Sequence, residues 1–156
     1  MPELEEGQVQ PNNKIVVDST NCHHQTKKVE TATSMYPGKL VIQGTNDDDV
    51  ICGTSGGAVY GWIGYNDVNK KYRPATISTI HLVNDQTDIV NGSGIIVFAW
   101  LLSGQTVVKG SRLIAAAGGF VQLYASGGGA DLTAGLAEES VASTDATTRL
   151  LVRRLI

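Results

Sequence analysis

The longest apolar run in this sequence is IIVFAWLL at residues 95–102, with Asn91-Gly92 before it and Ser103-Gly104 after it. Its length and its β-branched and aromatic residues favour a strand over a helix. Apolar side chains occupy both alternating sets of positions, so we expect a strand covered on both faces, inside a barrel or at a subunit contact. Asn-Gly is a strong hairpin dipeptide and predicts a tight turn into this strand.

The same pattern continues to the C-terminus as short β-rich runs separated by breaks that contain glycine. These runs are Val107-Val108, Arg112–Ile114, Phe120–Tyr124 and Leu150–Ile156. The segment Leu132–Glu138 fits a short strand or turn, and the polar residues 139–148 fit a loop. Such spacing is typical of a compact antiparallel sheet system.

Upstream of the run, residues 38–91 also predict short strands. We expect strands at 39–43, 49–52, 76–83 and 87–90, with turns at 44–48 and 84–86. Gly61 interrupts the apolar segment 58–63, which indicates a bulge or a close backbone approach. About nine short strands then predict an all-β protein, a small antiparallel β-barrel or sandwich.

Residues 1–37 are polar, and their one apolar cluster before Met35 is Ile15–Val17. A segment of this composition cannot bury enough apolar surface to offset its ordering entropy. We therefore expect an extended N-terminal arm over residues 1–37, with one short strand at Lys14–Val17. The β-barrel domain is expected over residues 38–156.

Composition excludes several functional classes. The net charge is −3 and charged residues make up 17% of the chain, whereas a nucleic-acid-binding protein normally has a basic face. The one basic cluster, Arg149, Arg153 and Arg154, is interpreted as solvated or interface-paired arginines. The N-terminus lacks the features of a signal peptide, and the longest apolar run is far below the ~20 residues needed to cross a bilayer. We expect a soluble protein without nucleic-acid or membrane partners.

Two groups of residues resemble catalytic or metal sites. Gly53-Thr54-Ser55-Gly56-Gly57 resembles the segment around the nucleophile of chymotrypsin-like proteases, but too few residues precede it for that scaffold. A hydrolase using Ser55 or His81 is therefore a hypothesis that the sequence disfavours. Cys22-His23-His24 could form a zinc site together with Cys52 and His81, although the spacing does not resemble paired zinc ligands.

The remaining motifs predict no chemistry. Asp47–Asp49 lacks the ligand layout of an EF-hand and is interpreted as a solvated hairpin turn, and Gly127–Gly129 as a flexible loop. Cys22 and Cys52 are expected to be free thiols, consistent with intracellular assembly. We therefore assign no catalytic, cofactor-binding or metal-binding residue, no cofactor and no enzymatic activity.

From residue 92 onward the motifs carry a family resemblance. The order is the apolar strand, then residues 107–113, Gly118-Gly119-Phe120-Val121, residues 135–141 and the terminal residues 148–152. This order resembles the C-terminal β-barrel of the small capsid decoration, or cement, proteins of tailed viruses. Ser111 and Gly118 stand where that family often has Asp.

The resemblance implies a non-catalytic virion structural protein, made in the host cytoplasm and bound to the outer face of an icosahedral head. It also implies a homo-oligomer, with trimers favoured, that binds the major capsid protein and stabilises contacts between its subunits. In that setting, the arm would serve for docking and the strand 95–102 for oligomer contacts. The alternative is a receptor- or glycan-binding β-module on a virion or cell surface, with Trp62, Tyr65 and Tyr72 as an aromatic platform.

Overall fold

The computed structural model describes residues 15–18, 21–64, 79–125 and 133–155. These residues form thirteen strands and one 3-10 turn, so the predicted all-β class is confirmed. The strands are β1 (Val16–Asp18), β2 (His23–Val29), β3 (Leu40–Gln43), β4 (Asp49–Cys52), β5 (Gly61–Ile63), β6 (Gln86–Asn91), β7 (Ile96–Trp100), β8 (Thr106–Val107), β9 (Arg112–Ala115), β10 (Val121–Leu123), β11 (Thr133–Ala137), β12 (Val141–Ala142) and β13 (Arg149–Arg153). The 3-10 turn η1 spans Ala117–Gly119.

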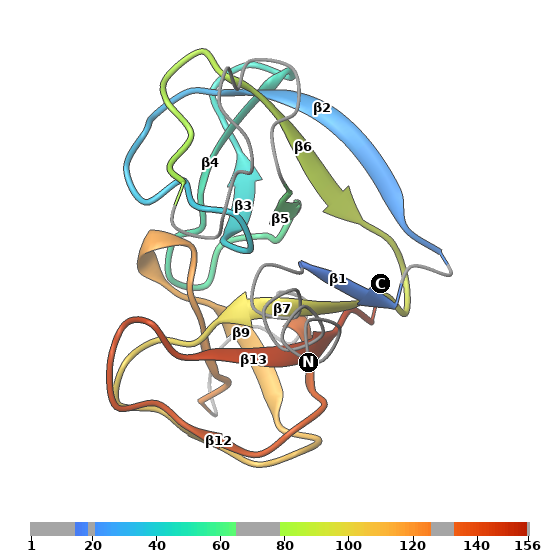
Figure 1. Cartoon of the computed structure of the whole chain (residues 1–156), viewed down its shortest axis with the longest axis vertical. Coiled ribbons are helices and arrows are strands. Elements are labelled where there is room, and N and C mark those ends of the chain that lie inside the picture. The colour runs from blue at the N-terminus through green and yellow to red at the C-terminus, as the bar shows by residue number, and fades with distance from the viewer. Residues whose placement is uncertain (1–14, 19–20, 65–78, 126–132, 156) are drawn as a thin grey trace, which may run out of the picture.

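The strands form two lobes. Strands β2-β4-β3-β5-β6 close into a barrel, drawn in the upper part of Figure 1. Strands β1-β7-β13-β11-β9-β10 form a six-stranded sheet below it, accompanied by the two-stranded ribbon β12-β8. The strand pairs are antiparallel except β2 with β4, which is parallel.

The barrel contains the predicted hairpin of β3 and β4, in which Val41 lies opposite Cys52. The close backbone approach predicted at Gly61 is also present. A Cβ atom on Gly61 would lie 2.6 Å from the Val90 carbonyl oxygen of the adjacent strand β6. Glycine is therefore required for β5 to pair with β6.

The apolar run forms β7, a central strand between β1 and β13. Val97, Ala99 and Trp100 are buried, whereas Ile96 and Phe98 are half-buried. The predicted Asn91-Gly92 hairpin is wrong, because β6 belongs to the barrel and β7 to the sheet. Instead, a turn at Ser93-Gly94 carries the chain from one lobe to the other, and the Gly94 N–H donates to the Arg154 carbonyl.

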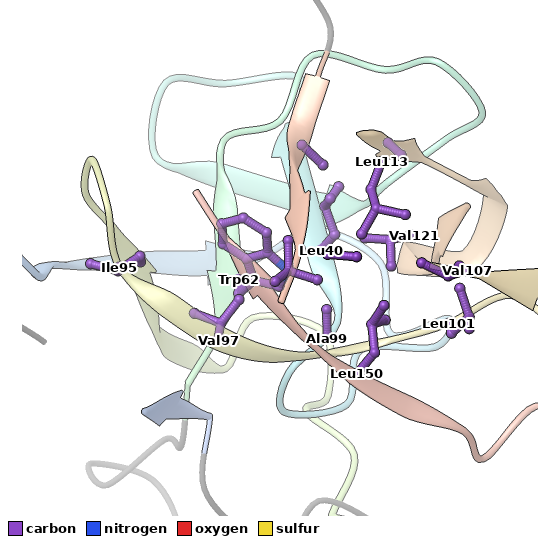
Figure 2. Close-up of a cluster of buried hydrophobic side chains, with 14 of the residues drawn as sticks. Leu40, Trp62, Ile95, Val97, Ala99, Leu101, Val107, Leu113, Val121 and Leu150 are labelled. Carbon is purple, nitrogen blue, oxygen red and sulfur yellow. The ribbon is translucent and has the colours of Figure 1, made fainter. Parts of the chain in front are cut away.

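One apolar core joins the two lobes. Leu40, Trp62 and Val90 from the barrel belong to the same buried cluster as the apolar side chains of the sheet. Figure 2 shows this cluster, with Trp62 and Leu40 among Val97, Ala99 and Leu150. Burial of such side chains contributes roughly 1.5–3 kcal/mol each, so the lobes stabilise one another.

The expected arm differs from the structure over residues 21–37. His23–Val29 form β2, which pairs with β6 at six positions and with β4 at two. Val29 and Met35 are fully buried. The segment looked unable to order because its side chains at 23–26 are exposed, but backbone pairing and the apolar residues at its end hold it in the barrel. Residues 1–14 lie outside the described ranges.

The short strand expected at Lys14–Val17 is found as β1, shifted to Val16–Asp18. The strand expected at 76–83 is absent over 79–83, and 76–78 lie outside the described residues. Instead, the His81 N–H donates to the Met35 carbonyl, and a turn at Val83-Asn84 leads into β6. Within the described ranges, there is no helix that is long and apolar enough to cross a membrane.

Candidate interaction surface

Aromatic and cationic side chains gather where the two lobes meet. We call them the seam cluster: Tyr36, Lys39, Phe98, Trp100, Phe120 and Arg149. They come from the loop before β3, from β7, from the residue before β10 and from the start of β13. No single segment contains more than two of them.

Trp100 is the base of the seam cluster. Its side chain is 9% exposed, and its indole Nε1–H donates to the Pro37 carbonyl at 2.8 Å. The Tyr36 ring lies 6.5 Å from the Trp100 ring, centroid to centroid. These contacts fasten the barrel loop 36–38 to the sheet strand β7.

Lys39 places a buried cation beside this indole. The residue is 3% exposed, and its Nζ lies 3.0 Å from the Phe120 ring centroid and 5.0 Å from that of Trp100. Burial lowers the pKa of Lys39 from 10.5 to about 8, since a low-dielectric setting disfavours the charged form. The faces of the two rings favour the charged form and partly offset this penalty.

Arg149 completes the seam cluster at the surface. Its guanidinium carbon lies 5.0 Å from the Phe98 ring and 5.9 Å from the Trp100 ring. Nη2 donates to the Phe98 carbonyl at 3.3 Å. Arg149, Phe98, Phe120 and Tyr36 are half-buried, so they present pre-ordered rings and a cation to solvent. Tyr, Trp and Arg in such positions are typical of protein-binding hot spots.

The three arginines predicted as one basic cluster have separate roles. Arg153 Nε pairs with Glu138 Oε1. Arg154 is 9% exposed, lies over the Trp62 ring and donates to the Ala134 and Val59 carbonyls. Since Val59 belongs to the barrel side and Ala134 to the sheet, Arg154 joins the two lobes. Only Arg149 contributes to the seam cluster.

The structure does not assemble the zinc set considered for Cys22, His24, Cys52 and His81. Cys22 and His24 are close, but Cys52 Sγ lies 3.2 Å from the Ser34 carbonyl and 3.4 Å from Met35 Sδ. His81 Nε2 lies 3.3 Å from the Gly64 carbonyl. Within the described ranges, no group of three or more His, Cys, Asp or Glu side chains could hold a metal ion.

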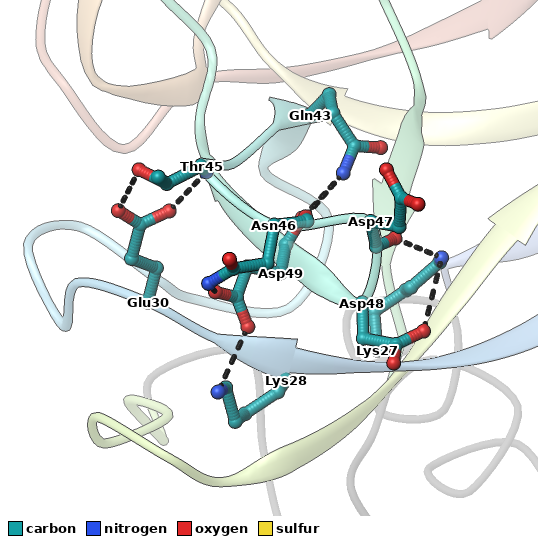
Figure 3. Close-up of polar contacts among 9 residues, drawn as sticks. All are labelled: Lys27, Lys28, Glu30, Gln43, Thr45, Asn46, Asp47, Asp48 and Asp49. Carbon is teal, nitrogen blue, oxygen red and sulfur yellow. Dashed lines mark hydrogen bonds and ion pairs between the residues drawn. The ribbon is translucent and has the colours of Figure 1, made fainter.

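The acidic turn Asp47–Asp49 uses its oxygens within the fold (Figure 3). Lys27 Nζ donates to the Asp47 carbonyl at 2.6 Å and lies 3.9 Å from Asp48 Oδ1. Asp49 is buried, accepts a bond from Asn46 Nδ2 at 2.6 Å and pairs with Lys28 at 3.0 Å. The Asn46 bond is the main cause that lowers the pKa of Asp49. The turn is confirmed, but Asp49 is not solvated as expected.

The remaining candidate residues are separated. Ser55 Oγ accepts a bond from Gln122 Nε2 at 3.4 Å, whereas His81 contacts Gly64 as described. Trp62 is fully buried and therefore cannot belong to an exposed aromatic platform. Tyr65, Tyr72 and Gly127–Gly129 lie outside the described residues. Sequence reasoning missed Tyr36, Lys39, Phe98 and Trp100 as a site because only tertiary packing brings them together.

The fold thus defines an all-β protein in which a five-stranded closed barrel and a six-stranded sheet meet in a shared apolar cluster, and the barrel has a second cluster of its own. No protein-family model matches this chain, and no curated protein matches it. Its structure is similar to the crystal structure of the head fiber gp8.5 N base of bacteriophage phi29, with a TM-score of 0.53 and 10% sequence identity. The similarity covers 85% of this chain and 93% of that one. At this identity the two proteins share a fold.

Proposed function

We propose that this protein is a structural protein of a tailed-virus particle that binds the outer face of the icosahedral head. The observation that carries the proposal is the fold similarity to the phi29 head fiber base over nearly the whole of both chains. The motif order of residues 92–156 supports it independently, because it resembles the decoration proteins of such heads. In this proposal the protein acts by binding, as a cement between neighbouring major capsid subunits, and not as an enzyme.

The seam cluster is the surface we propose for contact with the major capsid protein. Its rings and guanidinium are already ordered by contacts within the chain, so binding would lose little side-chain entropy. The half-buried guanidinium of Arg149 makes this surface locally cationic although the chain has a net charge of −3. A complementary acidic, partly apolar patch on the capsid subunit is therefore the expected partner surface.

Co-sedimentation with purified heads that lack the protein tests this proposal. We expect the full chain to bind saturably and Arg149→Ala to weaken binding about tenfold, as for a hot-spot residue. Lys109→Ala is the matched control, because Lys109 is an exposed cation in the turn between β8 and β9 and should bind as the wild type does. If the full chain does not bind heads, the function is wrong. If Arg149→Ala binds normally, the seam cluster is not the contact.

The oligomeric state is a separate part of the proposal. Sites of local three-fold symmetry on an icosahedral head favour a homotrimer of this chain, with identical heterologous contacts around the axis. Mass photometry of the purified protein, alone and in the presence of heads, measures this directly. A monomer in both conditions would contradict the trimer without affecting head binding.

A further inference from the structure

A cysteine, a histidine and an aspartate, none of them part of the seam cluster, form a hydrogen-bonded chain at barrel strands β2 and β6. Cys22 directly precedes β2, and His24 is the second residue of that strand. Residues two apart in extended chain point to the same face, and Cys22 Sγ lies 3.3 Å from His24 Nε2. His24 Nδ1 lies 2.7 Å from Asp88 Oδ2 on the neighbouring strand β6.

Strand register explains why Asp88 reaches His24. Thr26 lies opposite Asp88, and His24 lies opposite Val90, so His24 and Asp88 are diagonal neighbours on paired strands. The Gly64 N–H donates to the Asp88 carbonyl at 2.7 Å, which fixes the backbone from which the carboxylate extends. The geometry is therefore set by pairing on both sides of β6.

The hydrogen bonds assign a role to each atom. An ionised carboxylate can only accept, so the neutral imidazole carries its proton on Nδ1 and donates to Asp88. Nε2 then has a lone pair that accepts the Cys22 S–H. Burial and the Asp88 charge raise the pKa of the Cys22 thiol, which keeps the thiol protonated near neutral pH. A nucleophile, a base and a group that orients the base thus lie in sequence.

We propose that Cys22 is a base-assisted nucleophilic thiol that exchanges with small-molecule disulfides. In the step, Cys22 Sγ attacks one sulfur of the disulfide, a new Sγ–S bond forms and the original S–S bond breaks. The thiol proton passes to His24 Nε2 and then to the departing thiolate, which leaves as a free thiol. Cys22 is oxidised to a mixed disulfide, and one sulfur of the disulfide is reduced.

This reaction suits the site because negative charge develops only on sulfur, so no oxyanion-binding group is needed. Asp88 stabilises the imidazolium formed during proton transfer, as the orienting carboxylate does in a catalytic triad. Cys22 is half-buried and the side chain of His24 beside it is 58% exposed, so the thiol is partly accessible to a disulfide in solution. The proposed result is reversible covalent attachment of a thiol-bearing group to the barrel.

Cys52 supplies an internal comparison. Its Sγ contacts the Ser34 carbonyl and Met35 Sδ, neither of which can serve as a base comparable to imidazole. Burial raises the pKa of Cys52 to about 11. Cys22 therefore has an imidazole within hydrogen-bond distance, whereas the contacts of Cys52 are a carbonyl and a thioether.

The test is the rate at which each thiol of the full chain reacts with the aromatic disulfide 5,5′-dithiobis(2-nitrobenzoate) at neutral pH. Cys22, measured in Cys52→Ala, should react at least about tenfold faster than Cys52, measured in Cys22→Ala. In the Cys52→Ala background, His24→Gln should slow Cys22 about tenfold or more, the lower range of general-base effects, and Asp88→Asn by a smaller factor. His23→Gln is the matched control, because His23 is the adjacent exposed residue, and should leave the rate unchanged.

A second measurement uses the unaltered chain, so it does not depend on how a variant folds. After incubation with glutathione disulfide, peptide mass spectrometry should find one glutathionyl group on Cys22 before any on Cys52. Equal reactivity of the two thiols, or equal rates in His24→Gln and its parent, would overturn the proposal. So would a slowing by His23→Gln as large as that by His24→Gln.

Discussion

The ammonium of Lys39 lies 3.0 Å from the centroid of the Phe120 ring. Lys39 directly precedes barrel strand β3, and Phe120 directly precedes sheet strand β10. The contact therefore crosses from one lobe to the other, and it holds a cation that is 3% exposed. The two lobes are joined by charge on aromatic faces as well as by the apolar core.

This buried cation predicts that stability rises with pH in the mildly alkaline range. The pKa of Lys39 is about 8 in the fold and 10.5 in its ordinary state, so the unfolded chain binds the proton more tightly. The penalty for burying the charge is fully present below pH 8 and is relieved as pH rises towards 10.5. The full shift corresponds to at most about 3 kcal/mol, and attraction to the rings reduces it.

Urea denaturation of the wild type and Lys39→Met at several pH values measures this effect as a difference. Met keeps the length of the side chain without the charge. The free energy of unfolding of Lys39→Met should therefore lack the rise that begins near pH 8. Cys52 acts in the opposite direction, because its pKa is about 11 in the fold against 9.0 ordinarily. Its contribution is present below pH 9 and is lost as pH rises through 11. A pH-independent difference between wild type and Lys39→Met would show that the charge is not buried.

Trp100→Phe tests the hydrogen bond that fastens the barrel loop to β7. The substitution keeps a ring but removes the Nε1–H that the Pro37 carbonyl accepts. A buried acceptor without a partner costs about 1–3 kcal/mol, so we expect a loss of stability in that range in urea denaturation. Tyr36→Phe is the matched control, because Tyr36 is half-buried in the same cluster, and it should change stability by less than about 0.5 kcal/mol. Equal effects of the two variants would mean that the indole bond contributes little.

Local patterns predicted the parts of this fold that local physics determines. The β3–β4 hairpin follows from two short apolar runs around a polar turn. The close backbone approach at Gly61 follows from the presence of a glycine inside an apolar segment. The strand β2 was missed because its exposed residues His23–Thr26 look like an unstructured segment. Its order comes from pairing with β6, more than fifty residues along the chain, which composition does not reveal.

The candidate sites were less predictable for the same reason. The seam cluster draws residues from four separate segments, so no spacing along the chain identifies it. Cys22 and His24 can be paired from the sequence because they are nearly adjacent in it. Asp88, which orients the imidazole of His24, could be found only from the register between β2 and β6. The local motif therefore brought Cys22 and His24 together only as possible zinc ligands, and it did not indicate a reactive thiol or Asp88.

Gly61→Ala should disrupt the pairing of β5 with β6. The added Cβ would lie 2.6 Å from the Val90 carbonyl oxygen and 2.7 Å from Ile89 Cγ2, so the backbones must separate. Overpacking of this kind costs about 1–3 kcal/mol, and thermal unfolding should show the loss. Gly104→Asn is the control, since Gly104 has a positive φ of 81° and open space around its Cα. Asn tolerates that conformation, so the melting temperature of Gly104→Asn should stay close to that of the wild type.

Two truncations distinguish a docking arm from a barrel strand. Deleting residues 1–37 removes β1 and β2, so the barrel loses the strand that joins β4 to β6. It also removes Val29 and Met35, which are fully buried. Unpaired strand edges and an opened core should abolish cooperative unfolding.

Deleting residues 1–14 retains every described strand, and this variant should unfold like the full chain. Near-ultraviolet circular dichroism of Trp62 and Trp100, followed through a thermal melt, reports on the core in both. A native spectrum and a cooperative melt after deletion of residues 1–37 would contradict the role of β2. If the shorter deletion folds but no longer binds heads, the docking function belongs to residues 1–14.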